Sequence, residues 1–198
     1  METKRSIVGE FRLQIRTLLG VVALLWAIEI IDQIFFQGAL NRLGIQPRSL
    51  SGLWGILFAP FLHGDFAHLL ANTIPLVSLG WLIMLRETGD WLVVSIIAAL
   101  VSGLGTWLIG SPYSVHIGAS GVVFGYFGYL LLRGYFERSV VAIAFSLLVT
   151  FLYGGIIWGV LPTQPGVSWE GHLFGFIGGI LAAKLLATPR RKPNEFEV

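Results

Sequence analysis

The feature that most constrains the fold is a series of long apolar stretches separated by short polar segments. The first of them, residues 17–36, has the ~20 residues that an α-helix needs to span a hydrocarbon core of about 30 Å. Because only 12% of the residues are charged, against about 25% in soluble proteins, the sequence predicts an all-α polytopic membrane protein with a bundle of six helices. In chain order the apolar stretches are 17–36, 66–85, 91–109, 120–133, 140–160 and 171–187.

The segments outside these stretches set the expected domain limits. Residues 1–16 are polar and basic, and we expect them to form a cytoplasmic N-terminal segment. The apolar stretch that follows is too long for a signal-peptide core and precedes no cleavage motif of small residues, so it is interpreted as the first membrane helix. Residues 17–188 then form one membrane domain, and residues 189–198 form a cytoplasmic tail.

Basic residues concentrate on one side of the predicted bundle. Of the 13 Lys and Arg residues, 11 fall on the side of the N-terminus, and only Arg42 and Arg48 fall on the other side. Because cytoplasmic loops carry the excess of Lys and Arg, both termini are predicted to be cytoplasmic. The net charge of +2 comes without a basic patch on a soluble face, so nucleic acid is not expected as a partner.

A long loop is predicted between the first two membrane helices. Residues 37–64 contain five glycines and two prolines, and their apolar pieces are too short to cross a membrane. We expect this loop to lie at the membrane interface, where Trp54 anchors it. Glu29 and Asp32, near the end of the first helix, are expected to hydrogen-bond to the loop, because unpaired carboxylates are costly inside a membrane.

The fourth apolar stretch is the shortest. If its helix starts at Ser120 and reaches the cytoplasmic interface at Arg133, it has 13 residues and a length of about 20 Å, less than the hydrocarbon core. Ser120 would then lie about 10 Å below the outer surface, at a helix start whose N–H groups have no partner within the helix. Non-helical backbone at this depth requires a cavity or a covering of protein.

Other polar side chains are expected at a similar depth. His172 precedes Lys184 by 12 residues, about 18 Å along its helix. Asn72 precedes Arg86 by 14 residues, about 21 Å along its helix, and His68 lies one turn further on the same face. Three helices therefore bring a hydroxyl, an amide and two imidazoles to one layer.

The chemistry that these groups allow is acyl transfer. The Ser120 hydroxyl is the candidate nucleophile, and His172 is the candidate base, since an imidazole accepts and returns a proton near neutral pH. The Ser120 backbone N–H, Asn72 and His68 are the candidate donors to an oxyanion. Glu170 is two residues from His172 and would point to another face, so we infer a Ser/His dyad without an acid. The chain has no cysteine, which excludes a thiol nucleophile.

Glycines recur on one face of the two helices that carry this dyad. Such small residues let helix backbones approach closely in lipid, which would bring His172 towards Ser120. The glycines are Gly121, Gly125 and Gly128 in the fourth stretch, and Gly171, Gly175 and Gly179 in the sixth.

Three motifs occur in order along the chain. Residues 118–121 read Gly-Ala-Ser-Gly, residues 68–72 read His-Leu-Leu-Ala-Asn, and residues 172–179 read His-x-x-Gly-x-x-x-Gly. On a layout of six apolar stretches, these motifs resemble those of the rhomboid family of intramembrane serine proteases, over about residues 54–184.

The resemblance implies a function and a set of residue roles. It implies cleavage of single-span membrane proteins in or near the bilayer, with Ser120 as nucleophile and His172 as base. It implies His68, Asn72 and the Ser120 amide as the oxyanion site, and neither a cofactor nor a metal. We expect the protein to lie in a bacterial inner membrane; the resemblance leaves the oligomeric state open.

Two positions depart from the family pattern. The loop after the first helix often carries Trp-Arg in the family, whereas Trp54 is followed here by Gly55. The position four residues after the nucleophile is often a tyrosine stacked on the base, and here it is Phe124. Because phenylalanine keeps the ring, we expect Phe124 to stack on His172.

Other interpretations remain open at this point. The chain could be a catalytically silent rhomboid-like chaperone or adaptor, or a small transporter with His172 and Asp32 as proton relays. Ser102, in the run Ser-Gly-Leu-Gly, is a rival nucleophile, but it lies within a long helix. His63 and His116 are expected at the outer rim; no metal site is predicted, because His63 and His68 face different ways and lack a third ligand.

Overall fold

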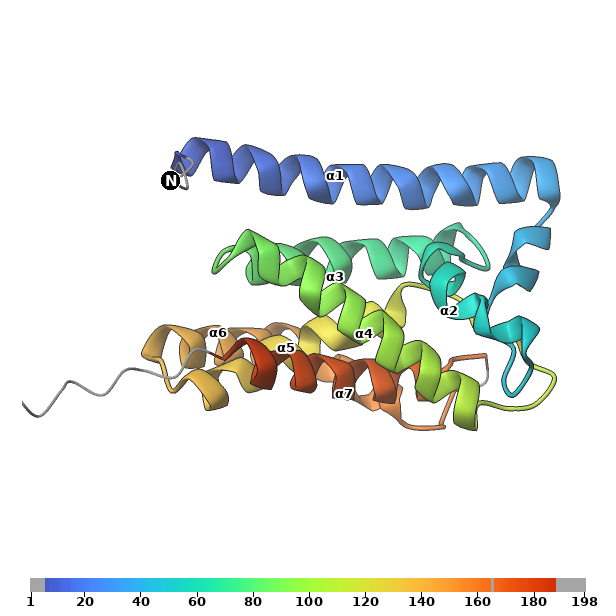
Figure 1. Cartoon of the computed structure of the whole chain (residues 1–198). Helices are drawn as coiled ribbons and strands as arrows, with labels where there is room; N and C mark the ends of the chain where they lie inside the picture. The colour runs from blue at the N-terminus through green and yellow to red at the C-terminus, as the bar shows by residue number, and fades with distance from the viewer. Residues whose placement is uncertain (1–5, 165, 188–198) are drawn as a thin grey trace, which may run out of the picture.

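The computed structural model describes residues 6–164 and 166–187 of the 198-residue chain (Figure 1). Within these residues the regular elements are helices, joined by loops that form one isolated bridge between Ile45 and His116. The longer helices are α1 (Ile7–Ile31), α3 (Phe66–Met84), α4 (Thr88–Ile109), α5 (Ser120–Glu137), α6 (Val140–Tyr153) and α7 (Trp169–Leu186). The short elements are the π-helix η1 (Asp32–Phe36), α2 (Gly55–Phe58), and the 3₁₀ turns η2 (Ala39–Leu43), η3 (Ser51–Leu53), η4 (Ala59–Phe61) and η5 (Gly154–Val160).

Four helical stretches of the described chain are long and apolar enough to cross a membrane. They are Ile7–Phe36, which joins α1 and η1, then α3, α4, and Val140–Val160, which joins α6 and η5. Helices α5 and α7 have 18 residues each and are not among the four. The all-helical fold class is therefore confirmed, while the count of six membrane helices stays a prediction.

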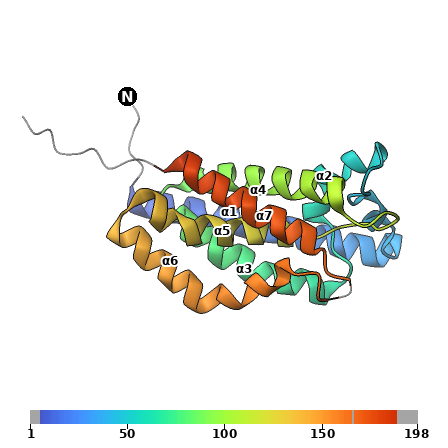
Figure 2. The same ribbon diagram turned by 90° about the horizontal axis from the view of Figure 1, so that it is seen from below.

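Helices α5 and α7 occupy the middle of the bundle. Each packs against the other and against α4, and α5 also packs against α6 and α3. Figure 2 shows α5 and α7 between α4 on one side and α6 on the other. Helix α1 packs mainly against α3 and lies at the edge of the bundle (Figure 1). The residues from 121 to 130 on α5 are all buried, which is the burial of a central helix.

Glycines make the close contact between α5 and α7 possible. A Cβ atom on Gly175 would overlap the carbonyl oxygen of Gly121, and one on Gly179 would overlap the carbonyl oxygen of Gly125. The other side of α5 is equally tight, because a Cβ atom on Gly121 would meet the Ser102 hydroxyl of α4. The predicted glycine face therefore lies at the contact between the two helices, where the backbones touch with no side chain between them.

One end of the bundle collects the start of α1, the α3–α4 turn and the end of α7. The Thr88 hydroxyl donates a hydrogen bond to the Glu10 carboxylate at 3.0 Å, and Arg86 donates to the carbonyl of Leu186 at 3.2 Å. Gln14 of α1 donates to the carbonyl of Met84 at 3.0 Å. The two ends of the described chain thus lie on the same side, at the left of Figure 1.

Two helix boundaries differ from the sequence prediction. Helix α5 starts at Ser120 as expected but continues four residues beyond Arg133, to Glu137. The extra turn is stabilised by Glu137, which pairs with Arg133 at 3.0 Å and with Arg86 at 2.7 Å. Helix α1 begins at Ile7, within the predicted N-terminal segment, because the Ser6 hydroxyl caps it by accepting from the N–H of Gly9. The predicted tail at residues 189–198 lies outside the described residues.

The loop after α1 is folded into short helical turns. Asp32 fixes its start, since its carboxylate accepts the N–H of Leu40 at 3.0 Å. Glu29 accepts from Gln33 at 2.9 Å, and the same Gln33 amide donates to the carbonyl of Gly64 at 3.2 Å. Asp32 therefore bonds to the loop that follows, as predicted, whereas Glu29 is linked to it through Gln33. Trp54, the predicted anchor, is 67% exposed.

Candidate active site

Ser120 is the first residue of α5, and the loop before it is held in place by backbone contacts. Gly118 has a φ of +113°, a conformation that favours glycine, and its N–H donates to the carbonyl of Ala59 at 2.8 Å. The N–H of Ala119 donates to Nε2 of His63 at 3.4 Å. The loop therefore delivers the Ser120 side chain at the N-terminus of a buried helix, where N–H groups lack helical partners.

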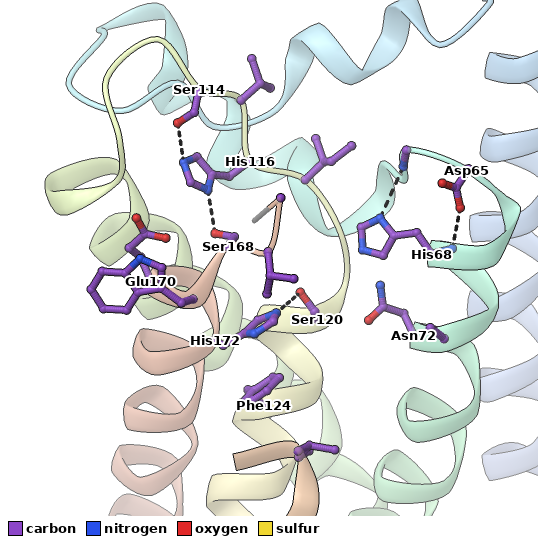
Figure 3. Close-up of a pocket in the computed structure, with 18 of the residues that line it drawn as sticks. Asp65, His68, Asn72, Ser114, His116, Ser120, Phe124, Ser168, Glu170 and His172 are labelled. Carbon is purple, nitrogen blue, oxygen red and sulfur yellow. Dashed lines mark hydrogen bonds between the residues drawn. The ribbon is translucent and has the colours of Figure 1, made fainter. Parts of the chain in front are cut away.

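The Ser120 hydroxyl meets the imidazole of His172 (Figure 3). Ser120 Oγ and His172 Nε2 are 2.9 Å apart, although the two residues come from different helices. The other ring nitrogen, Nδ1, lies 2.9 Å from the carbonyl oxygen of Gly159. A carbonyl only accepts, so Nδ1 carries the proton and Nε2 is left to accept from the serine. This is the tautomer that a general base requires.

The ring of His172 is also held from below. The Phe124 ring stacks on it with ring centroids 4.1 Å apart and planes 7° apart. A Cβ atom on Gly159 would come within 2.8 Å of Phe124 Cζ and 3.1 Å of His172 Nδ1. The absence of a side chain at Gly159 therefore leaves room for the stacked pair and for the carbonyl contact.

Polar groups of α3 form the opposite wall of the cavity. His68 and Asn72 project from α3 towards the side on which Ser120 lies (Figure 3). Asp65 caps this helix, since its carboxylate accepts the N–H of His68 at 2.7 Å. Asn72 is 6% exposed, and its Nδ2 has no hydrogen-bond partner among the described residues. A Cβ atom on Gly118 would lie 2.8 Å from His68 Nε2 and 3.6 Å from this amide nitrogen.

These groups line one cavity of about 850 Å³. The cavity extends from the dyad to Ser114, His116 and Ser168. The predicted site residues that line the cavity are Ser120, His172, His68, Asn72 and Phe124. A cavity with these polar groups on its wall therefore lies at the start of α5, while their depth in the membrane stays a prediction.

The rival nucleophile has a structural contact instead. Ser102 lies in α4, is buried, and donates its hydroxyl to the carbonyl of Gly171 at 2.8 Å. Glu170 is buried as well and points away from the dyad (Figure 3). In the described part of the chain, no three His, Cys, Asp or Glu side chains gather in a way that could hold a metal ion.

Three residues near the dyad make contacts that the sequence does not predict. Gly159 falls within the predicted apolar stretch 140–160 with no role assigned, yet its carbonyl orients the base. His63 is fully buried, contacts the His68 ring with centroids 5.0 Å apart, and has its pKa lowered to about 4 by burial and, less, by His68. His116 was predicted at the rim and instead bonds across two loops. Neither spacing nor composition indicates these contacts, because they depend on how loops pack.

Comparison with known proteins shows the family to which the chain is similar. The family model described as Rhomboid domain matches residues 50–189. The protein named Uncharacterized protein Rv1337, of Mycobacterium tuberculosis, is 46% identical over 184 residues, which cover 89% of this chain and 76% of the relative. Rhomboid protease GluP of Bacillus subtilis is 31% identical over 157 residues, covering 76% of this chain and 30% of GluP. Putative rhomboid protease YdcA, also of Bacillus subtilis, is 27% identical over 145 residues and 72% of each chain.

The chain has an all-helical membrane fold, and a histidine contacts a serine at the start of one helix. This combination is typical of helical membrane proteins of the serine-hydrolase type. The match covers most of the chain, so the chain belongs to the rhomboid family. With its apolar helices, it is a multi-pass integral membrane protein.

Proposed function

We propose that this chain is an intramembrane serine endopeptidase that cuts membrane proteins through a Ser120–His172 dyad. The observation that carries the proposal is the 2.9 Å contact between Ser120 Oγ and His172 Nε2, made while Nδ1 is held by a carbonyl oxygen. Membership of the rhomboid family supports the same reaction class.

The reaction has two halves. In the first, Ser120 Oγ attacks the peptide carbonyl carbon as its proton passes to His172 Nε2, and the carbonyl oxygen becomes an oxyanion. His172 then gives this proton to the leaving amine, the C–N bond breaks, and an acyl-enzyme ester remains on Ser120. In the second half, water attacks the ester while His172 takes its proton and returns it to Ser120, which releases the acid product.

The oxyanion needs donors that are already in place. We assign this role to the Asn72 amide, the His68 imidazole and the Ser120 N–H. The unpartnered Nδ2 of Asn72 supports the assignment, because a buried donor without a partner is costly unless a ligand uses it. Phe124 and Gly159 keep the imidazole in plane and in the right tautomer.

We further propose that all six long helices cross the membrane, with α5 and α7 shielded from lipid by the others. Both termini would be cytoplasmic, the membrane domain would occupy residues 17–188 with α1 starting earlier in the N-terminal segment, and the host membrane would be a bacterial inner membrane. The excess of basic residues on the side of the α3–α4 turn supports this orientation. Substrates would be single-span proteins whose segments unwind into the cavity.

The test is cleavage by purified protein in liposomes of a panel of single-span substrates, together with labelling by a serine-directed fluorophosphonate. Ser120→Ala and His172→Ala are expected to abolish cleavage, and Ser120→Ala to abolish labelling, with folding retained. Ser102→Ala is the matched control, expected to keep cleavage and labelling, since it removes a serine hydroxyl of the neighbouring helix α4 that does not contact His172. If Ser120→Ala is still labelled, the nucleophile is another residue. A folded wild type that neither labels nor cleaves would favour the silent chaperone or adaptor.

A further inference from the structure

His116 lies where the loop before α5 meets the segment before α7. Its ring nitrogens contact two serine hydroxyls, Nε2 to Ser114 Oγ at 2.7 Å and Nδ1 to Ser168 Oγ at 2.7 Å (Figure 3). Ser114 belongs to its own loop, whereas Ser168 is 54 residues further along the chain and immediately precedes α7. The imidazole therefore joins the loop that carries the nucleophile to the segment that carries the base.

The tautomer of His116 follows from its neighbours. Burial lowers its pKa, against a smaller opposing effect of the Glu170 carboxylate, so the ring is neutral near pH 7. The Ser114 hydroxyl donates to the carbonyl of Ser111, so it accepts from His116 Nε2–H. Nδ1 is then the acceptor, and the Ser168 hydroxyl donates to it.

The Ser168 hydroxyl bonds to His116 and does not cap α7. It is the N-cap of α7, a position at which a serine hydroxyl usually accepts from an N–H of the first turn. Here the side chain makes no capping bond. Its carbonyl accepts the N–H of His172 at 3.1 Å, so the residue lies one helical turn before the base. The hydroxyl is used between loops instead of within the helix.

The backbone of His116 is fixed at the same time. Its N–H and carbonyl both pair with Ile45 at 2.9 Å, which attaches the nucleophile loop to the loop after α1. From this anchored position, His116 precedes Ser120 by four residues, as Ser168 precedes His172 by four. A shift between His116 and Ser168 would therefore be passed on to the distance between the dyad atoms.

We propose that the His116–Ser168 hydrogen bond is an interloop tie that sets the alignment of Ser120 with His172, which makes His116 a positioning residue. The proposal rests on the proposed serine protease reaction. Because the tie acts mainly on the geometry of the reacting pair, its loss lowers kcat more than it changes KM.

The kinetic test uses His116→Ala, Ser168→Ala and the double variant. Each single variant is expected to lower kcat and the rate of fluorophosphonate labelling about tenfold, and the double variant to be no slower than either. Ser114→Ala is the matched control, expected within about twofold of wild type, because the other tautomer of His116 can still bond Ser168. His116→Asn should recover most of the rate, since an amide nitrogen or oxygen lies close to where Nδ1 was.

A second readout does not depend on activity. The chain has no cysteine, so nitroxides can be attached at Tyr113→Cys and Thr163→Cys, one exposed position on each side of the tie. The distribution of distances between the labels is expected to broaden in His116→Ala and in Ser168→Ala, but not in Ser114→Ala.

The outcomes separate the two proposals. A wild type that resists labelling would overturn the protease assignment, whatever the spin labels report. A wild type that labels, alongside His116→Ala and Ser168→Ala reacting at its rate, would overturn the tie alone. Additive losses in the double variant, or unchanged distance distributions, would also overturn it.

Discussion

At the scale of single residues, the base is oriented by a backbone carbonyl and an aromatic ring. The Gly159 carbonyl and the Phe124 ring hold His172 without any carboxylate. The contact between Ser120 and His172 could be predicted from the motifs around them and from the glycine faces of their helices. The Gly159 contact could not, because it arises from the 3₁₀ turn after α6, whose path depends on packing against α7.

A side chain at position 159 is expected to disturb the base. In Gly159→Ala the new Cβ would stand 2.8 Å from Phe124 Cζ and 3.1 Å from His172 Nδ1, so one of the two rings has to shift. We expect kcat to fall about tenfold or more, in line with the cost of small misalignments. Gly155→Ala is the control, because it lies in the same turn with no atom within 4 Å of the added Cβ. Equal activity of the two variants would contradict the steric argument.

His63 is expected to make stability depend on pH. Its folded pKa is lowered to about 4 by burial, so the unfolded chain binds the proton more readily. The stabilisation is complete above the unfolded pKa near 6.5 and is lost as pH falls through that value towards 4, about 2 kcal/mol by pH 5. His63→Gln keeps an acceptor for the Ala119 N–H but does not titrate. Its melting temperature should fall less than that of wild type between pH 7.5 and pH 5; parallel decreases would refute the assignment.

At the scale of helices, the contact between α5 and α7 depends on direct backbone approach. The spacings of three and four residues between glycines were enough to predict which faces meet. The length of α5 was not, because Arg133 looks like an interface residue in sequence and in the structure pairs with Glu137 within the helix. A basic residue that has an acidic partner one turn away does not mark the end of a helix.

Alanine at position 179 is expected to destabilise the bundle. Its Cβ would overlap the Gly125 carbonyl oxygen and force α5 and α7 apart, at a cost of about 2–4 kcal/mol. Thermal unfolding in detergent is the measurement. Gly20→Ala, on the edge helix α1 with no atom within 4 Å of the new Cβ, should leave the melting temperature unchanged or raise it slightly. A similar loss in both variants would rule out the close-contact explanation.

At the scale of the whole molecule, the bundle has two chemically distinct ends. One end carries the charged cluster of Arg86, Arg133 and Glu137 together with both ends of the described chain. The other end carries the folded loops and the cavity. The sequence predicts this polarity through the placement of Lys and Arg, whereas the packing of the loops over the cavity follows from contacts between distant segments such as Ile45 and His116.

This orientation can be tested on intact cells, because the chain has no cysteine to interfere. A membrane-impermeant maleimide should label Thr163→Cys before lysis, since that residue lies at the end with the cavity. Ser139→Cys, between α5 and α6 at the charged end, should be labelled only after lysis. The reverse pattern would invert the assigned topology.

The Gly159 carbonyl that contacts His172 has a consequence for the rate of the proposed reaction. A carbonyl oxygen carries only a partial negative charge, so it stabilises a protonated imidazole less than the buried aspartate of a Ser-His-Asp catalytic triad does. If the proposed protease activity is correct, a Ser/His pair without that aspartate would cut more slowly than a catalytic triad, which would spare the neighbouring membrane helices.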